Sequence, residues 1–132
     1  MDWQGAVLHH SASPDVSANT ITKWHKQRNF KTIGYHLVIR KDGSIETGRP
    51  INQQGAHAKG RNGSHIGICL TGNFTDSQPS LDQISSLINV LKGAISRFDI
   101  DINKIEKHHE ECPGQIPWQF IIKNIKEWLN VR

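Results

Sequence analysis

The chain has 132 residues, 36% of them hydrophobic and 21% charged, which suits one globular domain with a single core. No apolar run approaches the roughly 20 residues that cross a membrane, and the N-terminus lacks the basic-then-apolar order of a secretory signal. The net charge of +4 favours an anionic partner, but lysine and arginine are scattered along the chain, which argues against nucleic acid.

The first part of the chain predicts a strand, a short helix and a hairpin. Residues 5–12, GAVLHHSA, have the pattern of a short apolar strand that ends in polar residues. Ser17 and Asn19 are good N-caps for a helix that includes 21–30. Two β-rich runs within 34–48 flank Lys-Asp-Gly-Ser, whose Asp-Gly pair is a strong hairpin signal.

The middle of the chain predicts an exposed loop, a buried strand and a long helix. Residues 52–64 are rich in Gly, Asn and Gln, whereas 65–74 are almost unbroken apolar residues, as in a central strand covered on both faces. Ser80 and Gln83 form a capping-box pattern at the start of a helix over 80–98. Seven apolar residues fall on one stripe of this helix, namely Leu81, Ile84, Leu87, Ile88, Leu91, Ile95 and Phe98.

The last part predicts a short strand over 102–109 and a final helix that Pro117 starts. The order β-α-β-β-β-α-β-α indicates an α/β (α+β) fold, with a central mixed sheet flanked by helices in one domain over 1–132. We expect the final helix to dock on the core, and weak contact with an anionic membrane is the other interpretation. The residues concerned are Ile121, Ile122, Ile125, Trp128 and Leu129, with Lys123, Lys126 and Arg132.

Three polar clusters contain metal-affine side chains. HHSAS follows the first predicted strand, AHAKG lies in the predicted loop, and HHEEC follows the last predicted strand. A catalytic zinc takes three protein ligands, such as imidazole and thiolate, and leaves one position for water. Neighbouring residues of a strand point to opposite faces. Only one of His9 and His10, and one of His108 and His109, can therefore readily bind the same metal, and the spacing does not say which.

The two cysteines differ in their surroundings. Cys69 lies in the apolar run HIGICL, which is typical of a small buried hydrophobic residue. Cys112 follows a polar segment and precedes a proline, so it is the better candidate for a metal ligand. We expect free thiols or metal ligands rather than a disulfide between the two.

Four motifs in this order resemble the zinc-dependent type-2 N-acetylmuramoyl-L-alanine amidases, a family that includes phage lysozymes of the amidase kind and the peptidoglycan recognition proteins. The motifs are VLHHSAS, GYHLVIRKDGSIETGRP, GAHAKGRNGSHIGICLTGNF and HHEECPG, within residues 5–115. The resemblance implies a mixed sheet with a zinc-bearing groove on one face. It also implies hydrolysis of the amide bond between N-acetylmuramic acid and L-alanine in peptidoglycan.

Matched motif by motif, the resemblance implies that His9, His108 and Cys112 bind Zn²⁺. It places Tyr35 near the metal, where its hydroxyl would stabilise the oxyanion of the reaction, and His57 in the same groove. Core packing is the other interpretation of Tyr35, because alternation would put it on one strand face with Leu37 and Ile39.

The spacer before the cysteine departs from the family pattern. Related phage enzymes have a longer spacer with a catalytic lysine two positions before the cysteine, whereas Glu110 stands there in this chain. We expect His57, or else Glu110, to protonate the leaving amine. Lys59 and Arg61 are candidate contacts for stem-peptide carboxylates, or else ordinary exposed cations.

These motifs predict a monomeric zinc amidase that acts on bacterial peptidoglycan as a phage or prophage endolysin. We expect synthesis in the cytoplasm without a signal peptide, followed by release to the cell wall through a separate holin-type pore former. Three alternatives stay open. They are a peptidoglycan-binding module without catalysis, a cytoplasmic wall-recycling amidase, and a regulator that acts through a protein partner.

Overall fold

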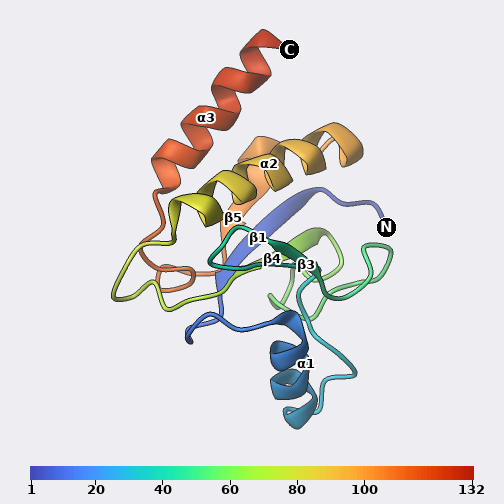
Figure 1. The fold of residues 1–132 in the computed structure, drawn as a ribbon. Coiled ribbons are helices and arrows are strands. Elements are labelled where there is room, and N and C mark those ends of the chain that lie inside the picture. Colours follow the sequence, from blue (N-terminus) through green and yellow to red (C-terminus); the bar gives the residue numbers. More distant parts are fainter.

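A five-stranded mixed sheet in the order β3-β2-β4-β1-β5 organises the computed structural model, which describes residues 1–132 (Figure 1). Its strands are β1 (Gly5–His10), β2 (Leu37–Ile39), β3 (Ile45–Thr47), β4 (His65–Leu70) and β5 (Ile105–Lys107). β4 pairs in parallel with β1 and β2, and β1 pairs in parallel with β5. The hairpin of β2 and β3 is antiparallel, so the predicted hairpin and the predicted mixed sheet are both confirmed.

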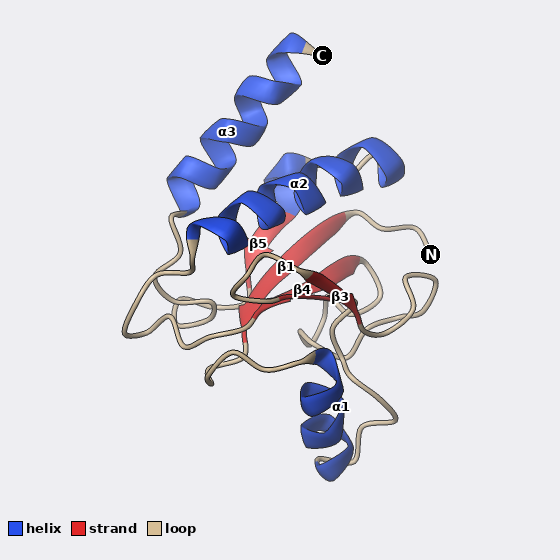
Figure 2. Ribbon diagram, in the orientation of Figure 1, coloured by secondary structure: helices blue, strands red, loops and turns tan.

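Helices cover both faces of this sheet (Figure 2). α1 (Ala18–Gln27) lies on one face, and α2 (Leu81–Phe98) and α3 (Trp118–Val131) lie on the other. A short 3₁₀ helix, Ile102–Lys104, leads into β5. The helices and strands follow the predicted order, and the chain forms the expected mixed α/β domain.

The two long strands, β1 and β4, are buried at every residue, because each has a strand on both sides and helices on both faces. A larger core between the sheet and the pair α2 and α3 includes Leu8 and Leu91. A smaller core between the sheet and α1 includes Ile21, Val38 and Cys69. Cys69 is thus a buried hydrophobic residue, as predicted, and both cysteines are free thiols.

The start of α2 follows the predicted capping box. The backbone N–H of Gln83 donates to Ser80 Oγ over 3.0 Å, and the backbone N–H of Ser80 donates to Gln83 Oε1 over 3.1 Å. The buried stripe of α2 is also confirmed, except at its first residue. Leu81 is 85% exposed, because it lies on the rim of the groove between α2 and α3, where neither helix covers it.

Tyr35 does not share a strand face with Leu37 and Ile39, so that expectation was wrong. Tyr35 packs with Val38 against the smaller core beside α1, whereas Leu37 and Ile39 belong to the larger core. The reason is that regular strand geometry begins only at Leu37, so strict alternation does not extend back to Tyr35.

The final helix docks on the core, as we expected. Ile121 and Ile125 are fully buried, while Ile122, Trp128 and Leu129 pack against the same core. None of the helices combines the length and apolar character that a membrane crossing requires. Contact of the exposed lysines of α3 with an anionic membrane stays a prediction.

We expect Gly93→Ala to raise the free energy of unfolding by roughly 0.5–1 kcal/mol, since glycine destabilises a helix interior relative to alanine. A Cβ at Gly93, inside α2, would meet nothing within 4 Å. Urea denaturation of the metal-free protein measures the effect. Gly34→Ala is the matched control, because its Cβ would collide with the carbonyl oxygen of Ala56 and should destabilise the protein. A less stable Gly93→Ala variant would contradict the open environment at this position.

Candidate metal centre

The ends of β1 and β5 bring two histidines together. β1 and β5 are parallel neighbours, so the carboxyl ends of both strands lie at the same edge of the sheet. The backbone N–H of His108 donates to the carbonyl of Leu8 over 3.1 Å and extends this pairing beyond β5. As a result the rings of His9 and His108 lie 4.6 Å apart between centroids, although 99 positions separate them in the numbering.

A tight turn adds the cysteine to this pair. The backbone N–H groups of His109 and Cys112 donate to each other's carbonyls over 3.1 Å, so the chain doubles back within four residues. Glu110 and Glu111 at the tip of this turn are exposed. One nitrogen each of His9 and His108 and the Sγ of Cys112 all lie within 4.8 Å of one another. The short spacer therefore suffices to complete a three-residue cluster.

Each histidine pair contributes one member to the cluster, as strand alternation predicts. His10 is directed to the other face of β1, where its Nδ1 accepts the backbone N–H of Phe74 over 3.0 Å. His109 is exposed, and its Nδ1 accepts the backbone N–H of Glu111 over 3.3 Å. Geometry thus decides between the neighbours, which their spacing in the sequence had left open.

Burial sets the protonation of the cluster. It lowers the pKa of His9 to about 2, with the neighbouring His57 as the next cause, and it also lowers the pKa of His108. Burial raises the pKa of the Cys112 thiol, although the backbone N–H of His10, which donates to Sγ over 3.4 Å, acts in the opposite direction. The histidines are therefore neutral at physiological pH and have lone pairs for a cation.

The donor set fits zinc. A tetrahedral zinc holds nitrogen at about 2.0–2.1 Å and sulfur at about 2.3 Å, which puts such ligand atoms roughly 3.5 Å apart. His9 Nδ1 lies 4.0 Å from Cys112 Sγ, so a small side-chain adjustment would bring both onto one ion. A bound divalent cation also stabilises a thiolate, so the raised thiol pKa does not oppose binding.

A pocket of about 310 Å³ opens beside the cluster. Besides the three cluster residues, it is lined by Tyr35, His57 and Lys59, all of which the sequence predicted for the site. The Tyr35 ring lies 5.0 Å from the His9 ring, and burial raises the pKa of its hydroxyl. Tyr35 therefore stays protonated and can donate a hydrogen bond into the pocket.

Two predicted site residues lie elsewhere. Glu110 is exposed and does not line the pocket. Arg61 does not line it either, because its guanidinium is engaged with a side chain of β5 and with the backbone at the end of that strand. It forms an ion pair with Glu106 over 2.9 Å and donates to the carbonyl of His108 over 3.0 Å. Arg61 thus holds the backbone of a cluster residue.

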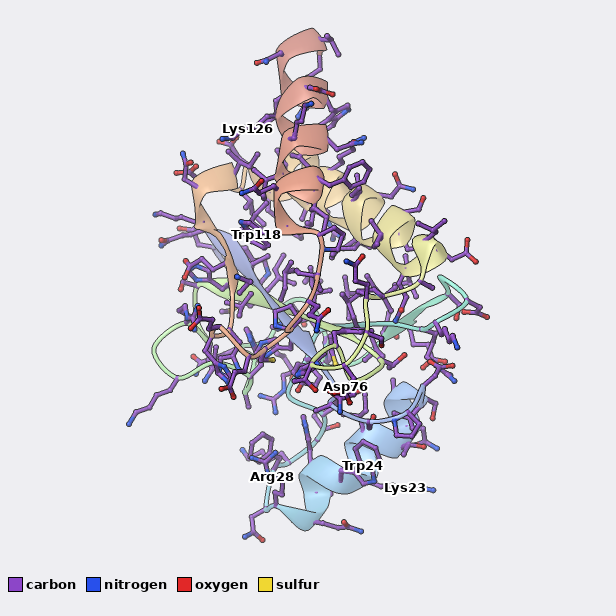
Figure 3. The ribbon with its side chains drawn as sticks, turned by 90° about the vertical axis from the view of Figure 1, so that its left-hand side faces the viewer. Lys23, Trp24, Arg28, Asp76, Trp118 and Lys126 are labelled. Atoms are coloured by element: carbon purple, nitrogen blue, oxygen red, sulfur yellow. The ribbon has the colours of Figure 1, made fainter.

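The sequence did not predict part of the pocket wall. His25, Arg28 and Phe30 line the pocket from the end of α1 and the loop after it. Figure 3 shows Arg28 at the end of the molecule that α1 forms, opposite the end where Lys126 of α3 lies. No local motif marks these residues, because only the docking of α1 on the sheet brings them to the site.

Residues 1–115 match the protein family described as N-acetylmuramoyl-L-alanine amidase. The chain belongs to this family. The endolysin of Escherichia phage T7 is 34% identical over an alignment of 119 residues, gaps included, and the alignment covers 83% of this chain and 77% of that protein. Peptidoglycan-recognition protein SC2 of Drosophila melanogaster is 32% identical over an alignment of 139 residues, gaps included, which covers 95% of this chain and 73% of that protein.

A solved structure agrees with these relatives. The N-acetylmuramoyl-L-alanine amidase LysC from Clostridium intestinale URNW superposes with a TM-score of 0.90 at 33% identity, over 96% of this chain and 87% of that chain. The resemblance that the motifs indicated is therefore confirmed, as is the predicted enzyme class, an amidase and thus a hydrolase.

Separate alanine substitutions of the two adjacent histidines of β1 test the geometry of the cluster. We expect His9→Ala to weaken zinc binding by more than about 100-fold, beyond the effect of losing an outer partner of a ligand. His10→Ala should keep its zinc affinity but lose about 1–3 kcal/mol of stability, because the buried N–H of Phe74 loses its acceptor. Competition with a chromogenic chelator and urea denaturation measure the two effects. The opposite pattern would assign the ligand to His10.

Proposed function

We propose that this chain is a zinc-dependent N-acetylmuramoyl-L-alanine amidase that cleaves the peptidoglycan of bacterial cell walls, with His9, His108 and Cys112 as the zinc ligands. The observation that carries the proposal is the convergence of their three ligand atoms within 4.8 Å, beside an open pocket. Two neutral imidazoles and a thiol suit zinc and leave a fourth position for water. Zinc, when bound, would supply a Lewis acid and lower the pKa of its water to about 7.

The residues of the pocket support the remaining parts of the reaction. Tyr35 lines the pocket and its hydroxyl is protonated, so it is the candidate donor to the oxyanion that develops on the substrate carbonyl. Lys59 is an exposed cation on the same pocket, which suits a carboxylate of the stem peptide. Glu110 does not line this pocket, so we do not assign it the transfer of a proton to the leaving amine.

We also propose a role as a phage or prophage endolysin, with one domain acting as a monomer on the cell wall after release by a separate pore-forming protein. The endolysin relatives support this role over that of a wall-recycling amidase. The family resemblance implies that members which bind peptidoglycan without cutting it typically lack the zinc cysteine. The presence of Cys112 in the cluster therefore favours catalysis over simple binding.

Digestion of purified peptidoglycan tests the proposed reaction. We expect the protein to release new free amino groups of L-alanine without new reducing sugar ends, and we expect a chelator to abolish the release. Cys112→Ala should be inactive and free of zinc. Cys69→Ala is the matched control, because Cys69 is the other free thiol and lies in the smaller core, outside the cluster. New reducing ends would instead indicate a glycosidase, and no product after zinc reloading would favour a binding module.

Tyr35→Phe separates the oxyanion donor from the metal site. We expect kcat to fall about 10²- to 10³-fold, the range found when one oxyanion donor is removed, while the zinc content stays unchanged. The phenyl ring keeps the packing against the smaller core, so stability should change little. Loss of zinc from this variant, or unchanged turnover, would contradict the role assigned to the hydroxyl.

A further inference from the structure

His57 connects the metal cluster to the sheet through two hydrogen bonds. Its Nδ1 lies 2.9 Å from Nε2 of His9, and its Nε2 lies 3.0 Å from the carbonyl oxygen of His65, the first residue of β4. The rings of His9 and His57 are nearly perpendicular, with centroids 5.0 Å apart. Hydrogen bonds therefore connect the carbonyl of His65, through the ring of His57, to His9 in the metal cluster in one continuous series.

With both imidazole rings neutral, the protons in this hydrogen-bonded series have one consistent arrangement. A carbonyl oxygen only accepts, so Nε2 of His57 carries the proton that it donates to His65. A neutral imidazole that donates from one nitrogen accepts at the other, so Nδ1 of neutral His57 is the acceptor of the bond to His9. His9 must then carry its own proton on Nε2. Its Nδ1, which lies 4.0 Å from Cys112 Sγ, is left as a lone pair that is directed to the cluster.

The chain is built to seat His57 in this position. Asn62 Oδ1 accepts the backbone N–H groups of His57 and Ala58 over 2.7 and 2.8 Å and so folds the loop inward. Gly67 lies in the middle of the buried strand β4, where glycine is unfavourable. A Cβ at Gly67 would lie 2.5 Å from the His57 ring, so the strand has a glycine where this ring packs against it.

We propose, on the basis of the function proposed above, that His57 is a positioning residue that holds His9 in its Nε2–H tautomer and directs the Nδ1 lone pair to the metal. Both nitrogens of His57 are engaged, one with His9 and one with His65, so neither has a free proton for the leaving amine. This assignment replaces the role of proton donor that we had expected from the sequence.

Two substitutions of His57 separate hydrogen bonding from packing. His57→Leu fills the space without an acceptor, and we expect zinc affinity to fall about 10- to 100-fold, as when an outer partner of a ligand is removed. His57→Asn keeps an oxygen near the place of Nδ1, so we expect it to recover most of this affinity. Chelator competition measures both, and hydrolysis of peptidoglycan should follow zinc occupancy.

The tautomer of His9 gives a readout that packing alone would not change. In the metal-free protein labelled with ¹⁵N-histidine, we expect two-bond ¹H–¹⁵N spectra to show His9 as a single Nε2–H tautomer, and His57→Leu to yield a mixture. His36→Asn is the matched control. His36 is also buried and accepts a backbone N–H of β4 through Nδ1, but it makes no hydrogen bond to His9. We expect that variant to lose stability and to keep both the tautomer and the zinc affinity.

The inference is overturned if His57→Leu keeps its zinc affinity and a single His9 tautomer. Loss of turnover in both His57 variants with zinc affinity intact would also overturn it, and would identify His57 as the proton donor. The tautomer of the metal-free protein can be read even if the wild type binds no zinc. Failure of the proposed function and failure of this inference are therefore distinguishable.

Discussion

The parallel pairing of β1 with β4 and β5 is the constraint on which the site depends. Parallel neighbours end at the same edge of the sheet, so residues from opposite ends of the chain meet there without a long excursion. The register is as important as the pairing. A slip of β1 by one residue would turn His10 toward the cluster and bury His9 on the other face. The cores on both faces of β1 resist that slip, because every residue of the strand is buried.

Histidines are numerous in this chain because their rings serve as hydrogen-bond partners in the interior as well as candidate ligands. Several rings accept backbone N–H groups of loops or strands, and no buried side-chain nitrogen or oxygen lacks a partner. The residues that accept in this way are His10, His25, His36 and His109. Burial also lowers the pKa of His10, His25 and His36, which favours their neutral form. A neutral, pre-oriented imidazole is also what a zinc site requires.

The short turn before Cys112 brings the cysteine to the cluster although few residues separate it from His108. Two backbone hydrogen bonds between His109 and Cys112 close the turn, and Arg61 ties the preceding carbonyl of His108 to Glu106. The geometry of the cluster therefore depends on the backbone of this turn, while its tip is exposed. Glu110, two positions before the cysteine, does not line the pocket, so the turn keeps His108 and Cys112 in the cluster while its tip stays outside the pocket.

The sequence alone determined the elements whose signals are local and the motifs whose residue types carry the chemistry. The capping box at Ser80, the Asp-Gly hairpin and the cluster of His9, His108 and Cys112 needed only short patterns or a resemblance to a family. Only the tertiary structure decided which face Tyr35 occupies, that Arg61 binds Glu106 and the carbonyl of His108 instead of lining the pocket, and that α1 supplies part of the pocket wall. The physical reason is that ring orientation, tautomer and burial depend on strand register and helix docking. These are set by contacts between residues far apart in the chain, which no local pattern records.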